Sequence, residues 1–173
     1  MQYLLLFSWH SFFRKIPLFW VRSIIFIYLF RNSIGRRSSL HRSLELYCIG
    51  GISIGQSTTI NKYVDLDGRG GLYIGNNVSI SAYVKIITGS HDIDSKDFKF
   101  KSEKIIIEDY VWIVTNALIL PGVTLKKGCV VAAGSVVTKD VEKYCVVAGN
   151  PAKPIKIRSS LLEYDPYWKP YLQ

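Results

Sequence analysis

The histidine at position 91 has the clearest setting for chemistry in this chain. His91 lies in the stretch T-G-S-H-D, whereas His10 and His41 lie among basic residues near the N-terminus. Imidazole is the side chain best suited to proton transfer near neutral pH. We therefore expect His91 to act as a general base that activates an incoming hydroxyl or amine. The alternative at this point is a loop histidine without a role.

Other catalytic chemistries lack the residues that they need. A catalytic zinc site of the three-histidine type cannot be built from His91 alone, so no metal is expected. Cys48, Cys129 and Cys145 form no C-x-x-C pair, and no Ser/His/Asp order typical of a catalytic triad is evident. We expect the cysteines to be small apolar residues of the core in a reducing compartment, which favours the cytoplasm.

A six-residue period occupies the stretch from Ile107 to Asn150 and predicts the fold. The first position of each unit is aliphatic, at Ile107, Ile113, Ile119, Leu125, Val131 and Val137. The same spacing joins Ile54, Ile60 and Leu66, and also Ile74, Ile80 and Ile86. Short repeats cannot bury an apolar face alone and must stack on their neighbours. The sequence predicts an all-β solenoid over residues 46–157.

The period is broken twice, and the larger break lies beside His91. The step from Leu66 to Ile74 is eight residues and contains glycines. The step from Ile86 to Ile107 is 21 residues and contains a polar, charged segment. Solenoids carry function on loops that interrupt them. We predict an inserted loop at 92–106 with His91 at its root.

Residues 1–45 differ in character from the repeats. They hold seven of the basic residues against Glu45 alone, which is +6 of the net charge of +9, and residues 3–30 are strongly apolar and aromatic. Basic residues and Pro17 interrupt the apolar runs, so no helix of about 20 apolar residues can span a membrane. Two interpretations stay open: helices in residues 1–30 that lie on an anionic membrane face, or a helical cap that packs on the solenoid or on another subunit.

The sequence after residue 45 argues against one further function class and ends in a distinct tail. The sequence after residue 45 is only mildly basic, so binding of nucleic acid is not expected. The C-terminal tail, residues 158–173, is aromatic and contains prolines. We expect it to pack back on the solenoid, as a short helix and an extended arm.

Several motifs together resemble one enzyme family. They are T-G-S-H-D at 88–92, V-W-I at 111–113, N-A at 116–117, I-L-P-G-V-T, A-A-G-S-V-V-T-K-D-V and A-G-N-P-A-K, within roughly residues 50–157. The chain resembles the left-handed β-helix hexapeptide-repeat acyltransferases, and within them the small bacterial sugar O-acetyltransferases of polysaccharide, O-antigen and colanic-acid-type pathways. The left hand of the helix and a homotrimer with active sites between subunits are what the resemblance implies.

The resemblance also implies the reaction and its residues. His91 would deprotonate a sugar hydroxyl, which attacks the thioester of acetyl-CoA directly, without an acyl-enzyme. A polar partner would orient the imidazole, and Asp65, Asp67 and Asp92 are the candidates. The contacts to acetyl-CoA, carried over residue by residue, fall on Thr115, Ala133, Thr138, Lys139, Lys153 and Lys156. Small residues let a pantetheine arm approach the backbone, and the lysines offer charge to phosphates.

One departure and several alternatives accompany this resemblance. The family usually has glycine at the position of Val114, which places the donor geometry at Thr115 in question. Other acceptors on the same fold are an amino sugar or a serine, and a non-enzymatic alternative is a repeat scaffold at the membrane. The enzyme would act in the cytoplasm or at the cytoplasmic face of the inner membrane.

Overall fold

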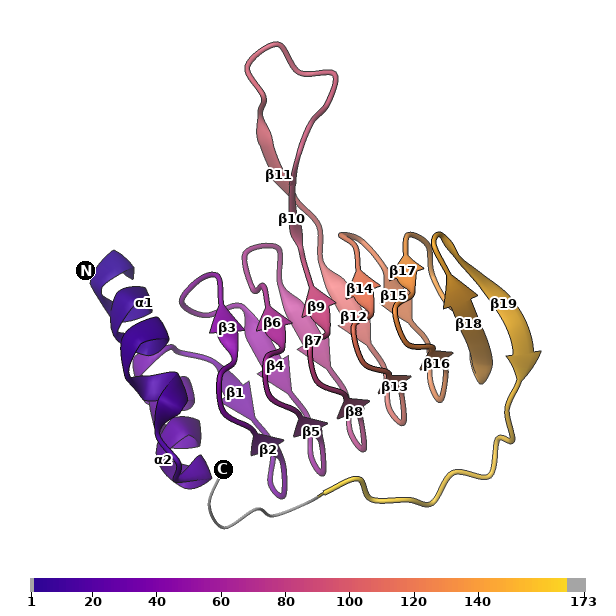
Figure 1. Cartoon of the computed structure of the whole chain (residues 1–173), viewed down its shortest axis with the longest axis horizontal. Coiled ribbons are helices and arrows are strands. Elements are labelled where there is room, and N and C mark those ends of the chain that lie inside the picture. Colours follow the sequence, from indigo (N-terminus) through magenta and orange to yellow (C-terminus); the bar gives the residue numbers. More distant parts are fainter. Residues whose placement is uncertain (1, 168–173) are drawn as a thin grey trace.

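Short strands follow one another in groups of three along the chain and wind it into a coil. The computed structural model describes residues 2–167. In this part of the chain the strands of the coils stack into three sheets, here named A, B and C, which form the three sides of a prism (Figure 1). Neighbouring strands run parallel, except for the last pair of sheet B, which is antiparallel. This arrangement confirms the predicted solenoid, a left-handed parallel β-helix of five complete coils and a partial sixth.

Each complete coil contributes one strand to each sheet. Sheet A holds β1 (Ser33–Ile34), β4 (Ile52–Ile54), β7 (Leu72–Ile74), β12 (Ile105–Ile107) and β15 (Thr124–Leu125). Sheet B holds β2 (Ser39–Leu40), β5 (Thr59–Ile60), β8 (Ser79–Ile80), β13 (Trp112–Ile113), β16 (Val130–Val131), β18 (Cys145–Gly149) and β19 (Ala152–Ile157). Sheet C holds β3 (Glu45–Leu46), β6 (Asp65–Leu66), β9 (Lys85–Ile86), β14 (Leu118–Ile119) and β17 (Val136–Val137).

The period of six arises because one strand and one corner together take six residues. The aliphatic residue at the end of each strand points into the prism and lies directly on its counterpart in the next coil, as Ile60 does on Ile80. These residues are almost all fully buried. Cys129 and Cys145 fill positions in the same core, and Cys48 is buried beside it, all three as free thiols. Burial raises the pKa of the Cys129 thiol to about 12.

The solenoid begins earlier in the chain than predicted. The boundary at residue 46 is wrong, because β1 pairs with β4, β2 with β5 and β3 with β6 in the same register as later coils. Ile34, Leu40 and Leu46 are spaced by six, but polar residues around them conceal this first coil. The described N-terminal helical segment is therefore restricted to residues 2–29.

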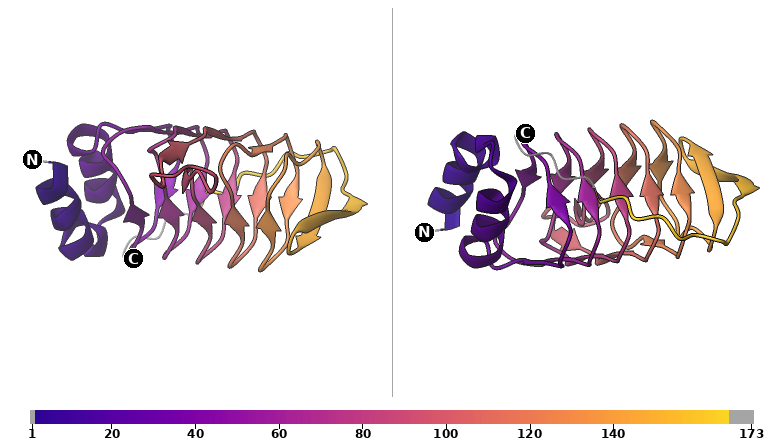
Figure 2. Two further views of the ribbon diagram at one scale, coloured as in Figure 1. Left: turned by 90° about the horizontal axis from the view of Figure 1, so that it is seen from above. Right: turned by 90° about the horizontal axis from the view of Figure 1, so that it is seen from below.

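The helical segment closes the open end of the first coil. It consists of α1 (Gln2–Ser11), the 3-10 turn η1 (Phe13–Lys15), α2 (Phe19–Ile24) and the π-helical turn η2 (Ile25–Leu29). Trp9 packs edge-on against Phe30 with ring centroids 5.1 Å apart, and its indole N–H donates to the Leu44 carbonyl at 2.9 Å. The helices thus supply the apolar layer that a further coil would otherwise provide, as Figure 2 shows from two sides.

The described part of the tail, residues 158–167, runs back along the corner between sheets A and B (Figure 1). The Tyr164 hydroxyl donates to the Tyr110 carbonyl at 2.8 Å, and Asp165 pairs with Arg37 at 2.6 Å. The predicted packing of the tail on the solenoid is confirmed for these residues, but the expected helix is absent from them. Residues 168–173 lie outside the described part of the chain.

Truncation of one core residue tests the stacking account. Ile113 is fully buried in sheet B between Ile80 and Val131. Ile113→Ala removes three carbons from a packed column, and we expect it to lower the free energy of unfolding by ~2–5 kcal/mol in urea denaturation. Ile93→Ala, at a position that is 90% exposed, is the control and should leave stability unchanged. Equal stability of both variants would contradict the packing described here.

Candidate active site

A β-hairpin leaves the solenoid at the corner between sheets C and A of the third coil. Its strands are β10 (Gly89–His91) and β11 (Phe100–Ser102), which pair antiparallel with His91 opposite Phe100. The hairpin projects away from the coil stack in Figure 1. The predicted loop at 92–106 is therefore corrected in extent: the excursion begins at residue 89, and Ile105–Ile107 already belong to sheet A as β12.

The same corner turns on glycines in the two preceding coils. Gly51 has a φ of +80°, and a Cβ there would lie 2.1 Å from the Gly68 carbonyl oxygen. A Cβ on Gly70 would lie 2.8 Å from the carbonyl oxygen of Glu103, the residue that follows the hairpin. Only glycine allows backbones to stack this closely. The two-residue insertion after Leu66 is thus the platform on which the root of the hairpin rests.

Asp67 fastens the hairpin root to this platform. Its side chain is fully buried, and its carboxylate accepts hydrogen bonds from the backbone N–H groups of Thr88 at 3.0 Å and Gly89 at 2.9 Å. The Thr88 hydroxyl donates to the Asp67 carbonyl at 3.2 Å and accepts the Gly70 N–H at 2.9 Å. Both strands of the root are held, because the Glu103 N–H donates to the Thr88 carbonyl at 2.9 Å.

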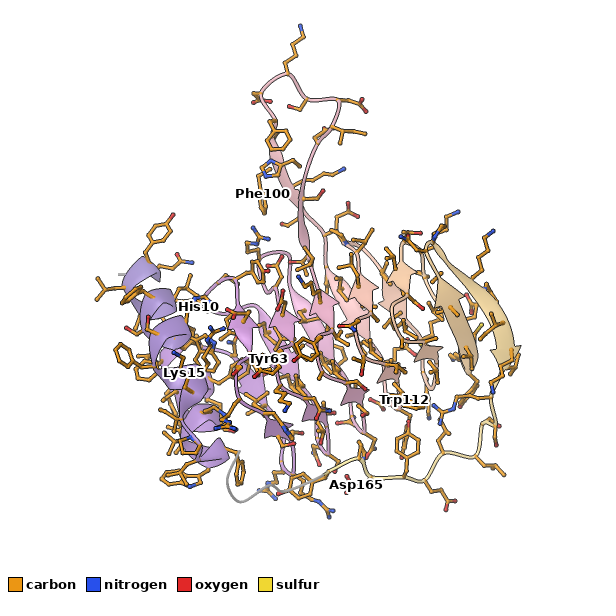
Figure 3. The ribbon with its side chains drawn as sticks, viewed as in Figure 1. His10, Lys15, Tyr63, Phe100, Trp112 and Asp165 are labelled. Carbon is orange, nitrogen blue, oxygen red and sulfur yellow. The ribbon has the colours of Figure 1, made fainter. Side chains whose placement is uncertain are left out.

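Arg69 connects the buried carboxylate to the aromatic side chains of the hairpin. Its guanidinium makes two hydrogen bonds to the Asp67 carboxylate, each at 2.9 Å. The same group lies 5.2 Å from the centroid of the Phe100 ring and 5.3 Å from that of Tyr47. The planar guanidinium can satisfy a carboxylate at its edge and pack on aromatic rings with its faces. Phe100 is labelled on the hairpin in Figure 3.

Hydrogen bonding determines the protonation state of Asp67. Burial by itself would raise the pKa of this carboxyl, but the hydrogen bonds from Arg69 and Gly89 and the charge of Arg69 outweigh it and hold the pKa below its ordinary value. The carboxylate is therefore charged at neutral pH. In return, it raises the pKa of Arg69, mainly through their hydrogen bonds.

His91 is held by three contacts within the hairpin. Its Nδ1 donates to the Phe98 carbonyl oxygen at 2.7 Å. The imidazole stacks on the Phe98 ring at 4.0 Å with 11° between the planes, and it meets the edge of Phe100 at 5.6 Å. A carbonyl can only accept, so Nδ1 carries the proton of the neutral ring. The Nε2 atom is left with its lone pair, which is the form that a general base requires.

The three aspartates considered as partners of the imidazole have other contacts. Asp92 belongs to the hairpin turn, where its carboxylate accepts the Asp94 N–H at 3.1 Å. Asp65 lies on sheet C, where it accepts the Tyr47 hydroxyl at 3.2 Å. Asp67 acts on His91 only through Arg69 and the hairpin root. The group that holds the imidazole is therefore the Phe98 carbonyl rather than one of these carboxylates. The chain turns back between His91 and Phe98, seven residues later, and this brings the carbonyl to the ring.

The residues expected to contact acetyl-CoA lie along two corners of the last coils. Thr115 and Ala133 share the corner between sheets B and C, where the Gly134 N–H donates to the Thr115 carbonyl at 3.0 Å. The turn that precedes Lys153 reaches the same corner, since the Gly149 N–H donates to the Ser135 hydroxyl at 3.2 Å. Thr138 and Lys139 lie at the next corner, after β17. Lys156 lies farther along β19, opposite Val146.

The B–C corner has the open surface that a narrow ligand needs. Ala133 and Gly134 are exposed. A Cβ added to Gly134 would meet nothing within 4 Å. Val114, the departure from the family pattern, precedes this corner and is half-buried, and its N–H and carbonyl both take part in the local backbone hydrogen bonds. The backbone at the valine therefore keeps its hydrogen bonds within the coil.

Sequence reasoning missed three residues around His91. Arg69, Phe98 and Phe100 were not singled out, although the two phenylalanines flank Lys99 in the polar inserted segment. Two aromatic residues in an otherwise polar insertion were the available signal. Nothing in the residue types indicated that Phe98 would act through its backbone.

The pKa shift of Asp67 predicts how stability depends on pH. A carboxyl with a lowered folded pKa stabilises the fold above its unfolded pKa of ~4, and this contribution is lost as the pH falls through the lower folded pKa. Asp67→Asn should therefore cost ~1–3 kcal/mol at neutral pH, and the difference from the wild type should shrink in the acid range. Thermal unfolding over pH 3–7 (roughly the range that spans both states) measures this.

Asp94→Asn is the matched control, since Asp94 is exposed in the hairpin turn. It should leave stability close to that of the wild type throughout. A loss in Asp67→Asn that does not depend on pH would show that the charge of the carboxylate is not what holds the hairpin root.

Comparison with known proteins places this arrangement in a family. No family model matches the chain. A hexapeptide-repeat-containing acetyltransferase of Vibrio cholerae O1 biovar eltor, solved with acetyl coenzyme A, is 31% identical with a TM-score of 0.77, over 89% of this chain and 83% of that one. A galactoside acetyltransferase solved with coenzyme A has the same TM-score of 0.77 over 94% of this chain and 84% of that one; at 22% identity it supports the fold alone.

A curated relative matches over a shorter stretch. A putative acetyltransferase of Schizosaccharomyces pombe is 43% identical over 76 residues, which are 42% of this chain and 37% of the relative. The match thus spans little more than a third of that protein. The Vibrio structure supplies the decisive likeness, because it shares both identity and coil stack over most of each chain. The chain belongs to the hexapeptide-repeat acetyltransferase family.

Proposed function

We propose that this protein transfers the acetyl group of acetyl-CoA to a hydroxyl group of a sugar, with His91 as the general base. The observation that carries the proposal is the 2.7 Å hydrogen bond from His91 Nδ1 to the Phe98 carbonyl. This bond leaves Nε2 able to accept a proton, which is the property that a general base needs. The chain belongs to a family of acetyltransferases, in which such a base can activate the acceptor.

The residues of the chain then have distinct roles in the reaction. His91 Nε2 takes the proton of the acceptor hydroxyl while the hydroxyl oxygen forms a bond to the acetyl carbonyl carbon. The bond between this carbon and the sulfur of coenzyme A then breaks, and the imidazolium can give its proton to the departing sulfur. Acetyl-CoA supplies the activated acetyl group as a thioester. Phe98 and Phe100 hold the ring, and Asp67 and Arg69 are positioning residues that act through the hairpin. General-base catalysis of this kind contributes ~10²–10⁴-fold to a rate.

The donor site fits the B–C corner of the last coils. The exposed backbone at Ala133 and Gly134 accepts a narrow chain lying along the corner. Lys153 is exposed near that corner, and among the described residues no carboxylate forms an ion pair with it. An unpaired ammonium group is suited to a phosphate of coenzyme A. Thr115 contributes the neighbouring turn.

The division of the candidate donor residues between two corners supports a homotrimer. Thr138 and Lys139 are separated from Ala133 by the width of sheet C. A ligand that lies between two parallel solenoids could touch one corner of each copy at the same time. We therefore propose three copies packed side by side, with each donor site between two of them and His91 at the same junction.

A sugar is the acceptor that we favour within bacterial surface-polysaccharide synthesis. The motifs around His91 and the last coils resemble those of sugar O-acetyltransferases. An amino group on a sugar is the competing acceptor, because N-acyltransferases share the fold. An acceptor panel of sugars, amino sugars and their nucleotide- and lipid-linked forms distinguishes the two, and exclusive transfer to amines would overturn the hydroxyl assignment.

Replacement of His91 tests the role of the base. His91→Gln keeps a polar side chain but cannot take up a proton, and we expect acetyl transfer to fall at least ~100-fold. Stabilisation by coenzyme A in a thermal shift assay should be retained, because the base does not hold the donor. His10→Gln is the matched control: this histidine pairs with Glu45 near the first coil. Turnover that survives in His91→Gln would rule out the proposed base.

Removal of one lysine tests the donor site separately. Lys153→Ala should weaken coenzyme A binding by ~10-fold, the loss expected of one charge-assisted hydrogen bond. Titration calorimetry measures the affinity. Lys143→Ala removes an exposed lysine from a turn of the last coils and should bind coenzyme A as the wild type does. Equal affinities of all three proteins would place the phosphates elsewhere.

A further inference from the structure

The helical segment presents an apolar face that no described residue covers. We name helices α1 and α2 with their turns η1 and η2 the end cap. On α1, Tyr3, Leu4 and Phe7 are 88%, 75% and 67% exposed. The other exposed large apolar residues of the end cap are Phe12, Leu18, Trp20, Ile24, Tyr28 and Leu29. Figure 3 shows side chains projecting from the end cap on the side away from the coils.

Packing on the solenoid does not account for these residues. The inner side of the end cap is already occupied by Trp9, Phe26 and Phe30, which are fully buried against the first coil. Helix α1 is therefore apolar on both its inner and outer sides. A surface helix of a water-soluble protein is normally polar on its outer side. Contiguous exposed apolar surface marks a site of interaction with a protein or a membrane.

Charge around the end cap indicates the nature of the partner. Lys15, Arg31, Arg36 and Arg42 are exposed, and no carboxylate among residues 2–167 forms an ion pair with them. By contrast, Arg37 at the first coil is neutralised by Asp165. Unpaired positive charge beside exposed aromatic and aliphatic side chains is complementary to a surface that is anionic outside and apolar within.

A hollow in the end cap combines both kinds of contact. It has a volume of about 540 Å³ and lies between α1 and the turn η2. Its lining consists of Gln2, Leu5, Tyr28, Leu29, Arg31 and Ile49. The guanidinium of Arg31 suits a phosphate group. The apolar side chains beside it suit the first carbons of acyl chains. This combination favours phospholipid over a polar protein surface.

We propose that the end cap docks on the surface of an anionic phospholipid bilayer. In the described part of the chain, no helix has the length and apolar character needed to cross a membrane. The end cap would therefore lie in the interface, with Leu4 and Phe7 among the acyl chains and Trp20 and Tyr28 at the level of the headgroups.

Docking would place the active site near the bilayer, a consequence that rests on the proposed function. The hairpin leaves the third coil, which lies two strand spacings, or ~10 Å, from the first coil. It extends across the axis of the solenoid rather than along it (Figure 1). Three end caps of a parallel trimer would share one face, and each His91 would meet acceptors held at the membrane.

Vesicle binding by the full chain tests the proposal. Sedimentation with vesicles of phosphatidylcholine and phosphatidylglycerol should capture the wild type, and vesicles of phosphatidylcholine alone should capture much less. Leu4→Ser with Phe7→Ser should reduce capture by at least ~10-fold. Ile157→Ser with Leu161→Ser is the matched control, because both residues are exposed at the opposite end of the solenoid, and it should bind vesicles as the wild type does.

The remaining outcomes separate this proposal from the proposed function. Thermal stabilisation by coenzyme A should be equal in the wild type and in the Leu4→Ser, Phe7→Ser variant, which shows that the donor site is intact. Absence of vesicle binding in a wild type that binds coenzyme A would overturn docking alone. Association of the wild type through this face, seen by light scattering and lost in the variant, without vesicle binding, would assign the face to a second copy and also overturn the proposal.

Discussion

Asp67 lies buried where the hairpin leaves the coil, and the position of the histidine depends on it. Its carboxylate accepts hydrogen bonds from the backbone N–H groups of Thr88 and Gly89, and from two guanidinium N–H groups and the backbone N–H of Arg69. A buried charge is stable only when such partners satisfy it, and the loss of one partner leaves the buried charge only partly compensated. The hairpin root is therefore fixed to the second coil rather than free to pivot on two chain connections.

The regular stacking of the solenoid allows the second coil to position the imidazole on the third coil accurately. Stacked coils place each corner directly over the preceding one, so the glycine corner of the second coil becomes a surface that matches the third. Arg69 then transmits the position of Asp67 to Phe100, and Phe100 and Phe98 confine the imidazole of His91. Sites supported by a second layer of contacts on a rigid scaffold hold their geometry better than sites on free loops.

The period of six was sufficient to predict the solenoid and to place His91 at its largest interruption. The first coil was missed because Ile34, Leu40 and Leu46 stand among polar residues, and only pairing with the second coil reveals their role. The partner of His91 could not be predicted either. A backbone carbonyl has no signature in residue type, and it reaches the ring only through the fold of the hairpin.

The Phe98 carbonyl fixes the tautomer of His91 through its hydrogen bond to Nδ1. Long-range ¹H–¹⁵N correlation spectra of the imidazole report which ring nitrogen carries the proton, and the signals of His91 can be assigned by their absence from the His91→Gln spectrum. The structure predicts protonated Nδ1 and unprotonated Nε2 in the neutral ring. A neutral ring protonated at Nε2 would contradict the account, because the atom proposed to accept the proton would already hold one.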